Sequence, residues 1–206
     1  MQFYSDDRQD EFIANLFGFG KNGTFLDIGS CASVGSNNTY FFESLEWRGI
    51  CIEKNPMFND SYSQRTCRFV NADATEVDYK KLFKEEGIMD ITYLSLDVDQ
   101  DSTKVLEKLL ATGHRFIAIT IEHDGHVHGD LYRGPQRELL ISHGYYLLCA
   151  DVLNQSGRNI GREHGWEDWW VHPLFFTDDF INSVTCSRQF TDQIIKRVKE
   201  FNKFRQ

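Results

Sequence analysis

The chain has 206 residues, of which 41% are hydrophobic and 26% are charged, and its formal net charge is −9. This size and composition predict one soluble globular domain over 1–206 and exclude a second full domain and extensive disorder. The acidic balance argues against a nucleic-acid partner bound through its phosphates, so none is expected.

The hydrophobic pattern predicts strands and helices that alternate along the chain. The expected strands cover 24–28, 49–53, 67–71, 91–98, 116–121, 145–152 and 169–176. The expected helices are a leading helix over 5–19, then 38–46, 56–65, 78–86, 101–111 and 131–142, and finally C-terminal helices over about 178–204. Pro173 confines the last strand to a sheet edge or cuts it short. This alternation predicts an α/β three-layer sandwich with a mixed seven-stranded sheet.

The cysteines and the lack of long apolar segments bear on the cellular compartment. The five cysteines are scattered without a Cys-x-x-Cys pair, which is typical of reduced thiols. No apolar run reaches the length of a membrane span, and the acidic N-terminus does not resemble a signal peptide. We therefore expect a cytoplasmic protein without a membrane span, and the sequence leaves a homo-oligomer open.

The stretch 24–56 predicts a right-handed βαβ unit, whose ligand crevice lies beyond the carboxyl ends of its strands. Gly29 ends the first strand where the backbone must turn sharply or approach a ligand. Glu53 closes the second strand, where a carboxylate can accept hydrogen bonds from two ribose hydroxyls. No glycine-rich pyrophosphate loop follows the first strand. A nucleoside cofactor without a pyrophosphate therefore fits better than NAD or ATP, and a plain βαβ unit with a solvated Glu53 is the alternative.

A longer motif runs through this stretch: Asp-x-Gly, a polar loop, Asn-Thr-Tyr, and then Trp-x-Gly-x-x-x-Glu-x-Asn-Pro. It is met by Asp27, Gly29, Asn38, Thr39, Tyr40, Trp47, Gly49, Glu53, Asn55 and Pro56. In this motif the chain resembles FkbM-type methyltransferases, a branch of the class I S-adenosylmethionine-dependent enzymes. The likeness continues in Ser-Leu-Asp-Val-Asp and Ile-Glu-His and covers about 23–173. The chain departs from the pattern in two places. The loop 30–35 lacks the common Gly-x-Gly, and Gln100 stands where a glycine usually follows Val-Asp.

The resemblance implies a Rossmann-like class I methyltransferase fold with S-adenosylmethionine as cofactor. It carries the cofactor-binding role to Asp27, Gly29, Ser30, Asn38, Glu53, Lys54, Asp73 and Ala74. Asp73 follows the third strand and is the candidate for the adenine amino group. Its alternative role is to cap a helix, for which Asp78 is better placed.

Acidic and imidazole side chains follow the two central strands, namely Asp97 and Asp99 after one and Glu122 and His123 after the other. Methyl transfer to a hydroxyl requires removal of its proton, which makes Asp97, Asp99 and His123 the candidate catalytic residues. In one interpretation, similar to metal-dependent O-methyltransferases, Asp97, Glu122 and His123 hold Mg²⁺ or Mn²⁺. In the other, no metal binds and His123 or Asp99 is the general base.

A histidine-rich segment follows the second of these strands. His123, His126 and His128 suggest zinc, but their spacing does not match the helical two-histidine motif. Gly125 and Gly129 instead predict a flexible loop that faces the substrate or the solvent.

Tryptophan and arginine side chains are further candidates for acceptor contacts. Trp166 and Trp169 either face an acceptor or fill the core, with Trp170 inward. Arg133 and Arg137 either bind an anionic acceptor or lie on a solvated helix face.

Together these features predict an S-adenosylmethionine-dependent O-methyltransferase acting on a hydroxyl of a sugar, a glycan precursor or another small metabolite. Two alternatives stay open. One is a catalytically inactive module of the same fold that binds a nucleoside cofactor. The other is a nicotinamide-dependent oxidoreductase, although its glycine-rich phosphate turn is missing. The acceptor itself is not readable, because its specificity lies in the loops.

Overall fold

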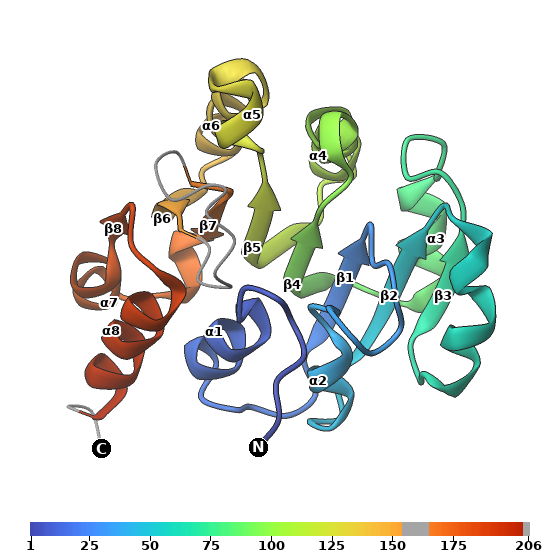
Figure 1. Ribbon diagram of the computed structural model, residues 1–206, viewed down its shortest axis with the longest axis horizontal. Coiled ribbons are helices and arrows are strands. Elements are labelled where there is room, and N and C mark those ends of the chain that lie inside the picture. Colours follow the sequence, from blue (N-terminus) through green and yellow to red (C-terminus); the bar gives the residue numbers. More distant parts are fainter. Residues whose placement is uncertain (154–164, 204–206) are drawn as a thin grey trace.

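The computed structural model describes residues 1–153 and 165–203, whose strands form one sheet covered by helices (Figure 1). The strands are β1 (Thr24–Ile28), β2 (Arg48–Glu53), β3 (Arg68–Asn71), β4 (Asp90–Leu96), β5 (Arg115–Glu122), β6 (Tyr146–Val152), β7 (Glu167–Val171) and β8 (Cys186–Ser187). The α-helices in these ranges are α1 (Gln9–Leu16), α2 (Tyr40–Glu43), α3 (Tyr79–Glu86), α4 (Ser102–Leu110), α5 (Gly125–His128), α6 (Asp130–Ser142), α7 (Asp178–Val184) and α8 (Thr191–Lys203). Short 3₁₀ helices are η1 (Pro56–Gln64), η2 (Asp99–Asp101) and η3 (Pro173–Phe175).

The strand order in the sheet is β3-β2-β1-β4-β5-β7-β6-β8. Strands β1 to β5 are mutually parallel, and β7 runs antiparallel between β5 and β6. The chain moves outward from β1 to β3 and then returns to β4 on the other side of β1. This reversal between β1 and β4 is the topological switch point, where ligands bind in open α/β sheets.

Helices cover both faces of the sheet, with α1, α2, α7 and α8 on one side and α3, α4 and α6 on the other (Figure 1). Alternate strand residues point to opposite faces. Phe25 and Tyr93 therefore join the core beneath α1, whereas Leu26 and Leu94 join the core beneath α4. Because both faces are covered, the central strands read as nearly continuous apolar runs in the sequence.

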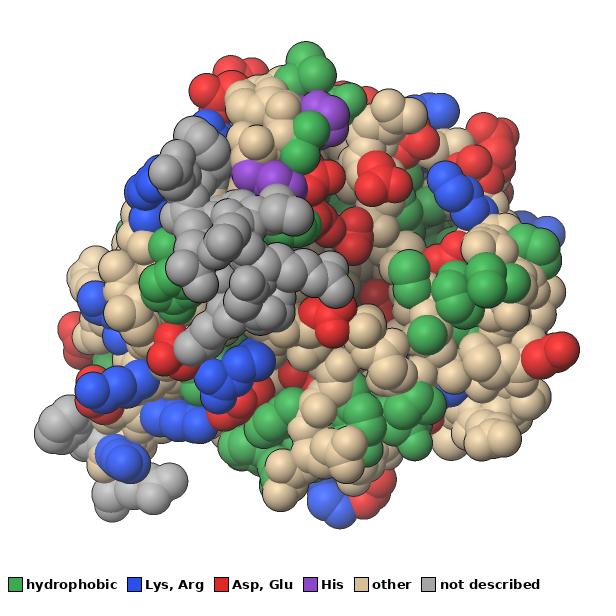
Figure 2. Space-filling model, viewed as in Figure 1, with side chains coloured by type: hydrophobic (Ala, Val, Ile, Leu, Met, Phe, Trp, Pro, Cys, Tyr) green, Lys and Arg blue, Asp and Glu red, His purple; other side chains and the backbone are tan. Residues whose placement is uncertain are grey.

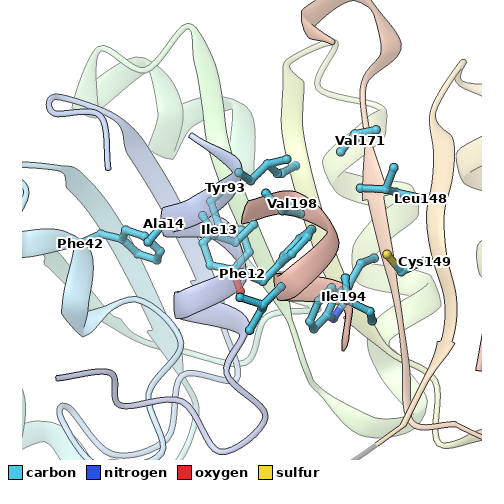
Figure 3. Packing of buried hydrophobic residues seen from close by; sticks show 14 of the residues in the cluster. Phe12, Ile13, Ala14, Phe42, Tyr93, Leu148, Cys149, Val171, Ile194 and Val198 are labelled. Carbon is cyan, nitrogen blue, oxygen red and sulfur yellow. The ribbon is translucent and has the colours of Figure 1, made fainter. Parts of the chain in front are cut away.

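The leading helix α1 lies over the centre of the sheet and is held there by aromatic packing. Figure 3 shows Phe12 and Ile13 of α1 close to Tyr93 of β4 and Val198 of α8. The Phe12 ring stacks on Trp169 of β7 with 4.1 Å between the ring centroids. Burial of one such ring stabilises the fold by about 2 kcal/mol.

Residues next to α3 in the sequence determine where this helix begins and ends. The Asp78 side chain accepts a hydrogen bond of 3.0 Å from the Lys81 N–H, which confirms Asp78 as the N-cap. At the other end, Gly87 has φ 63° and ends the helix in the left-handed conformation that favours glycine.

The α/β three-layer architecture is confirmed, but the strand number and the loop after β5 were predicted wrongly. The sheet has eight strands rather than seven, because Cys186 and Ser187 form a two-residue strand beside β6 that leaves no hydrophobic pattern. Of the two alternatives for the last strand, the shortened strand is confirmed and the edge position is not, because β7 lies between β5 and β6. It ends at Val171, and Pro173 begins η3, so the proline cuts the strand short. The predicted flexible loop after β5 contains the short helix α5.

Some predicted segments differ only in extent. The helix predicted over 38–46 is the four-residue α2, and the leading helix over 5–19 is confined to α1. Residues 154–164 of a polar segment before β7 lie outside the described residues. Nowhere in 1–153 or 165–203 does a helix combine the length and the apolar character needed to cross a membrane. All five cysteines are free thiols.

Candidate active site

A cavity of about 210 Å³ opens at the carboxyl ends of β1, β2, β3 and β4. Seven of the predicted site residues line it: Gly29, Glu53, Lys54, Asp73, Ala74, Asp97 and Asp99. Cys31, Val98 and Thr75 also line it and were not predicted as site residues. Their only signal in the sequence was a position close behind a strand end, where the loops of an α/β sheet form its ligand crevice.

Gly29 allows the loops after β1 and β4 to meet at the floor of the cavity. Its φ is 80°, and a Cβ atom at this position would lie 1.6 Å from the Asp97 carbonyl oxygen. The Gly29 N–H donates to the Ile52 carbonyl at 2.9 Å, and the Asp97 N–H donates to the Ile28 carbonyl at 2.9 Å. Any other residue would push the two loops apart.

Glu53 presents a fixed carboxylate to the cavity. The residue is only 7% exposed, so the alternative of a solvated side chain is wrong. Its Oε2 accepts from the Cys31 N–H at 3.0 Å, and its Oε1 accepts from the Asn55 N–H at 2.7 Å. Each carboxylate oxygen can accept a further hydrogen bond. Glu53 can therefore bind two neighbouring hydroxyl groups without moving.

Asp73 does not cap the helix that follows, because Asp78 is the N-cap of α3, and its contact with the adenine stays a prediction. Its Oδ1 accepts from the Thr75 N–H at 2.8 Å and from the Thr75 hydroxyl at 2.7 Å. These bonds lower the pKa of Asp73, so that it is anionic near neutral pH. The residue shapes its own turn and also lines the cavity beside the buried Ala74.

Asp97 and Glu122 form a carboxyl pair where β4 and β5 end. Their side chains are hydrogen-bonded to each other, and burial raises the pKa of both. The charge of Asp97 adds to the rise at Glu122. Solvent reaches Asp97 through the cavity although protein encloses its other sides. Solvation through the cavity therefore favours the negative charge of the pair on Asp97, and burial favours the proton on Glu122.

Left-handed backbone conformations occur after three strands, two of which end at the cavity. Cys31, Asp99 and Asp124 have φ values of 46°, 50° and 48°. Such conformations are costly for residues other than glycine and persist where the surrounding structure enforces them. Asp99 is exposed in the cavity wall, so it is open to a bound ligand.

The electrostatic field of the cavity is negative. Burial, together with the charges of Glu53 and Asp97, raises the pKa of Cys31 to about 11. Figure 2 shows Asp and Glu side chains gathered along the hollow on this face of the molecule. A cationic ligand would be stabilised here, and an anionic one would be repelled.

Three predicted cofactor residues do not line the cavity: Asp27, Ser30 and Asn38. Asp27 is buried on the α2 side of β1 and accepts from the Thr39 hydroxyl at 2.8 Å. Burial raises the pKa of Asp27 to about 6, against the lowering effects of Thr39 and the charge of Arg65. Asp27 thus supports the loop after β1 from behind.

Ser30 and Asn38 are likewise engaged by protein groups. The Tyr62 hydroxyl donates to Ser30 Oγ at 2.7 Å, and Asn38 Nδ2 donates to Ser95 Oγ at 2.9 Å. Both side chains connect the loop after β1 to neighbouring elements, so their direct contact with a cofactor remains a prediction.

His123 lies outside the cavity and is 2% exposed. Its Nδ1 accepts from the Gly125 N–H at 3.0 Å, so the hydrogen of the neutral ring lies on Nε2. Nε2 points between two carboxylates, 3.5 Å from Asp168 Oδ1 and 3.8 Å from Asp151 Oδ1. The structure therefore does not bring His123 together with the predicted base Asp99 or with Asp97 in the cavity wall.

Two arginines complete this buried cluster. Arg133 Nη1 lies 2.6 Å from Asp151 Oδ1, and Arg137 Nε lies 2.7 Å from Asp168 Oδ2. Although burial alone would raise it, the hydrogen bonds from Arg137 and the nearby His123 ring lower the pKa of Asp168. Of the two alternatives for these arginines, the solvated face is wrong, because they pair with two aspartates, and binding of an anionic acceptor stays a prediction.

The predicted metal site of Asp97, Glu122 and His123 is not supported. Within 1–153 and 165–203, the metal-ligand atoms of three such side chains approach within 4.8 Å of one another only at His123, Asp151 and Asp168. There the arginines already balance both carboxylates, and Nε2 offers a hydrogen rather than a lone pair. The residues of this cluster thus fit an ion-pair network better than a cation.

The remaining predictions concern tryptophan and histidine side chains, which make packing contacts in the structure. Trp169 and Trp170 are fully buried in the two opposite cores, so Trp169 does not face an acceptor and Trp170 points inward as expected. The His126 ring packs against Trp166 with 4.2 Å between centroids, and His128 lies beside Tyr132 at 5.0 Å. The histidine-rich segment is therefore held by aromatic contacts.

Solved structures with the same fold bind S-adenosylmethionine or its product. The chain is similar to an O-methyltransferase from Bacillus cereus in complex with SAH, with 14% identity over 80% of each chain and a TM-score of 0.55. It is also similar to fibrillarin from Aeropyrum pernix with natively bound S-adenosyl-L-methionine, with 14% identity, coverage of 79% of this chain and 76% of that one, and a TM-score of 0.52. The fold is therefore the Rossmann-like fold of the class I methyltransferases.

A third solved structure extends the same conclusion. A TehB-like SAM-dependent methyltransferase from Corynebacterium glutamicum matches with 11% identity, coverage of 84% of this chain and 89% of that chain, and a TM-score of 0.55. The sequence matches no family model and no curated protein. The fold is thus established, whereas the resemblance to the FkbM branch remains a prediction.

Proposed function

We propose that the protein is an S-adenosylmethionine-dependent methyltransferase. The observation that carries this proposal is the cavity at the switch point, where Glu53 holds a fixed carboxylate beside Gly29 and Asp97. The fold shared with solved methyltransferases supports it. S-adenosylmethionine supplies a methyl group on a positively charged sulfonium, and a negative cavity favours such a cation.

The residues that follow successive strands fit successive parts of this cofactor. Glu53, after β2, would accept hydrogen bonds from the ribose hydroxyls. Asp73 and Ala74, after β3, would flank the adenine. Gly29 and Cys31, after β1, would then line the methionine part, since the loops of β1 and β4 form the rest of the cavity. Asp27, Ser30 and Asn38 would support these loops from behind.

We assign O-methylation as the reaction, with Asp97 as the residue that takes the proton from the acceptor hydroxyl. Asp97 is anionic, open to the cavity and has a raised pKa, which makes it a better base than an ordinary carboxylate. Glu122 holds the proton of the pair and keeps Asp97 charged. Asp99 is the alternative base. The acceptor would be a hydroxyl of a sugar, a glycan precursor or another small metabolite.

Calorimetry with SAH tests the cofactor assignment. We expect the wild type to bind SAH and not NAD, and Glu53→Ala to weaken SAH binding by about tenfold or more, because two charge-assisted hydrogen bonds are lost. Glu138→Ala is the matched control, since Glu138 is exposed on α6. Binding of NAD alone, or no binding of SAH, would overturn the proposal.

Methyl transfer to a panel of hydroxylated acceptors tests the assignment of the base. We expect Asp97→Asn to reduce turnover by about 10²-fold or more while SAH binding is retained. The exposed Asp60→Asn serves as control. Equal turnover by Asp97→Asn and the wild type would move the role to Asp99.

A further inference from the structure

The loop between β1 and α2 is shaped by side chains rather than by glycines. It contains only Gly29 and Gly35, in place of the Gly-x-Gly common in class I methyltransferases. Its carbonyl groups nevertheless find partners, since Asn37 Nδ2 donates to the Ser30 and Ala32 carbonyls at 3.0 Å each. The Tyr62 hydroxyl lies 3.1 Å from the Ser30 carbonyl. The loop conformation is thus imposed by groups that surround it.

Arg65, which follows η1, makes the most extensive of these contacts. Its side chain is 1% exposed. Nη1 donates to the Ser33 carbonyl at 2.6 Å and lies 3.2 Å from Asn37 Oδ1. Nη2 lies 3.3 Å from Thr39 Oγ1. Because Thr39 in turn donates to Asp27 Oδ2 at 2.8 Å, one guanidinium connects the loop to the buried carboxylate of β1.

The charge of Arg65 is balanced on the side away from the cavity. Nε donates to Glu43 Oε1 at 2.6 Å, and Glu43 lies at the end of α2. The guanidinium also lies over the rings of Tyr40 and Tyr62, at 5.1 and 5.6 Å from their centroids. A buried arginine is tolerated only with partners of this kind. The planar fork of donors on arginine can satisfy all of them at once, which a lysine cannot do.

We infer that Arg65 is a positioning residue for the methyl-donor site. It holds the loop 30–37 in the conformation that lets Cys31 close the cavity on the β1 side, whereas Glu53 is also anchored outside this loop by the Asn55 N–H at 2.7 Å. This inference rests on the proposed function. The loop lies over β1, whereas the nucleoside part of the donor would lie over β2 and β3. Arg65 should therefore govern the affinity for the methionine part and leave the affinity for the nucleoside part nearly unchanged.

Two ligands separate these parts experimentally. SAH contains both, and 5′-methylthioadenosine contains the nucleoside and the sulfur but lacks the amino-acid end. In calorimetry we expect Arg65→Lys to weaken SAH binding by about tenfold or more and methylthioadenosine binding by less than about twofold. Arg68→Lys, an exposed arginine at the start of β3, is the matched control and should change neither affinity. Glu53→Ala should weaken both.

Each outcome has a distinct meaning. If the wild type binds neither ligand, the proposed function fails. If the wild type binds SAH and Arg65→Lys binds it with the same affinity, only the inference fails. The inference also fails alone if Arg65→Lys keeps the circular dichroism of the wild type but loses affinity for both ligands equally. Should Arg65→Lys not fold, Tyr62→Phe decides instead, because it removes only the hydroxyl that donates to Ser30. A selective loss of SAH affinity in Tyr62→Phe would support the inference, and equal affinities would overturn it.

Discussion

Glu167 at the start of β7 is a buried acid whose ionisation should control stability near neutral pH. It is 6% exposed, and Gln9 Nε2 from α1 donates to its Oε1 at 3.1 Å. Burial and the nearby charge of Asp7, against the nearby Trp169 indole and the hydrogen bond from Gln9, raise the pKa of Glu167 from 4.5 to about 8. The carboxyl is therefore neutral in the folded protein under conditions where the unfolded chain has already lost the proton.

The sign and the size of the effect follow from the two pKa values. The folded state binds the Glu167 proton more tightly than the unfolded state, so the stabilising contribution of this residue is fully present below pH 4.5 and is lost as the pH rises towards 8. One pKa unit corresponds to about 1.4 kcal/mol. Between pH 5 and pH 7.5 this residue should remove about 3 kcal/mol from the free energy of unfolding. That is a large share of the stability of a domain, which is about 5–15 kcal/mol.

Glu167→Gln removes the ionisation and keeps the shape of the side chain. Urea unfolding at pH 5, 6 and 7.5, followed by tryptophan fluorescence, gives the free energies. We expect the stability of the variant relative to wild type to increase by about 3 kcal/mol from pH 5 to pH 7.5. Any packing cost of the amide is the same at each pH and cancels. The exposed Glu138→Gln should show no such trend. A difference between Glu167→Gln and wild type that does not change with pH would refute the reasoning.

Two further substitutions probe the cavity floor and the buried ion pairs. Gly29→Ala places a methyl group 1.6 Å from the Asp97 carbonyl, so SAH binding measured by calorimetry should be lost, whereas Gly134→Ala meets nothing within 4 Å and should bind normally. Asp168→Asn breaks the pair with Arg137 and should lower the free energy of unfolding by about 3 kcal/mol, as measured in urea. SAH binding by Gly29→Ala would contradict the first expectation. A decrease in the free energy of unfolding below about 1 kcal/mol in Asp168→Asn would contradict the second.

The order and type of most elements could be predicted because they depend on local patterns. The apolar runs at β1, β4 and β5 are long enough to identify central strands, and Asp78 and Gly87 mark the ends of α3 by their own chemistry. Strand β8 could not be predicted, since two residues carry no periodicity. The position of β7 inside the sheet depends on its pairing with β5 and β6, which are distant in the chain.

Part of the candidate site could likewise be predicted from where its residues lie relative to the strands. Gly29, Glu53 and Asp97 follow parallel strands, and the carboxyl ends of such strands meet at one edge of the sheet. Their convergence on one cavity therefore needed only the strand assignments. His123 occupies an equivalent position but turns towards Asp168, because β7 runs beside β5 and brings that carboxylate within 3.5 Å.

The sequence by itself determined the βαβ unit, the crevice beyond it and the acids at the strand ends, because backbone propensity, hydrophobic alternation and the geometry of parallel strands act over short stretches of chain. Only the tertiary structure decided the partner of each polar group. Arg65 supports a loop 28 residues earlier at Asn37. Glu122 takes its proton by lying against Asp97, and Glu167 stays neutral because α1 covers it. These properties arise from contacts between distant segments and from burial, which no local pattern encodes.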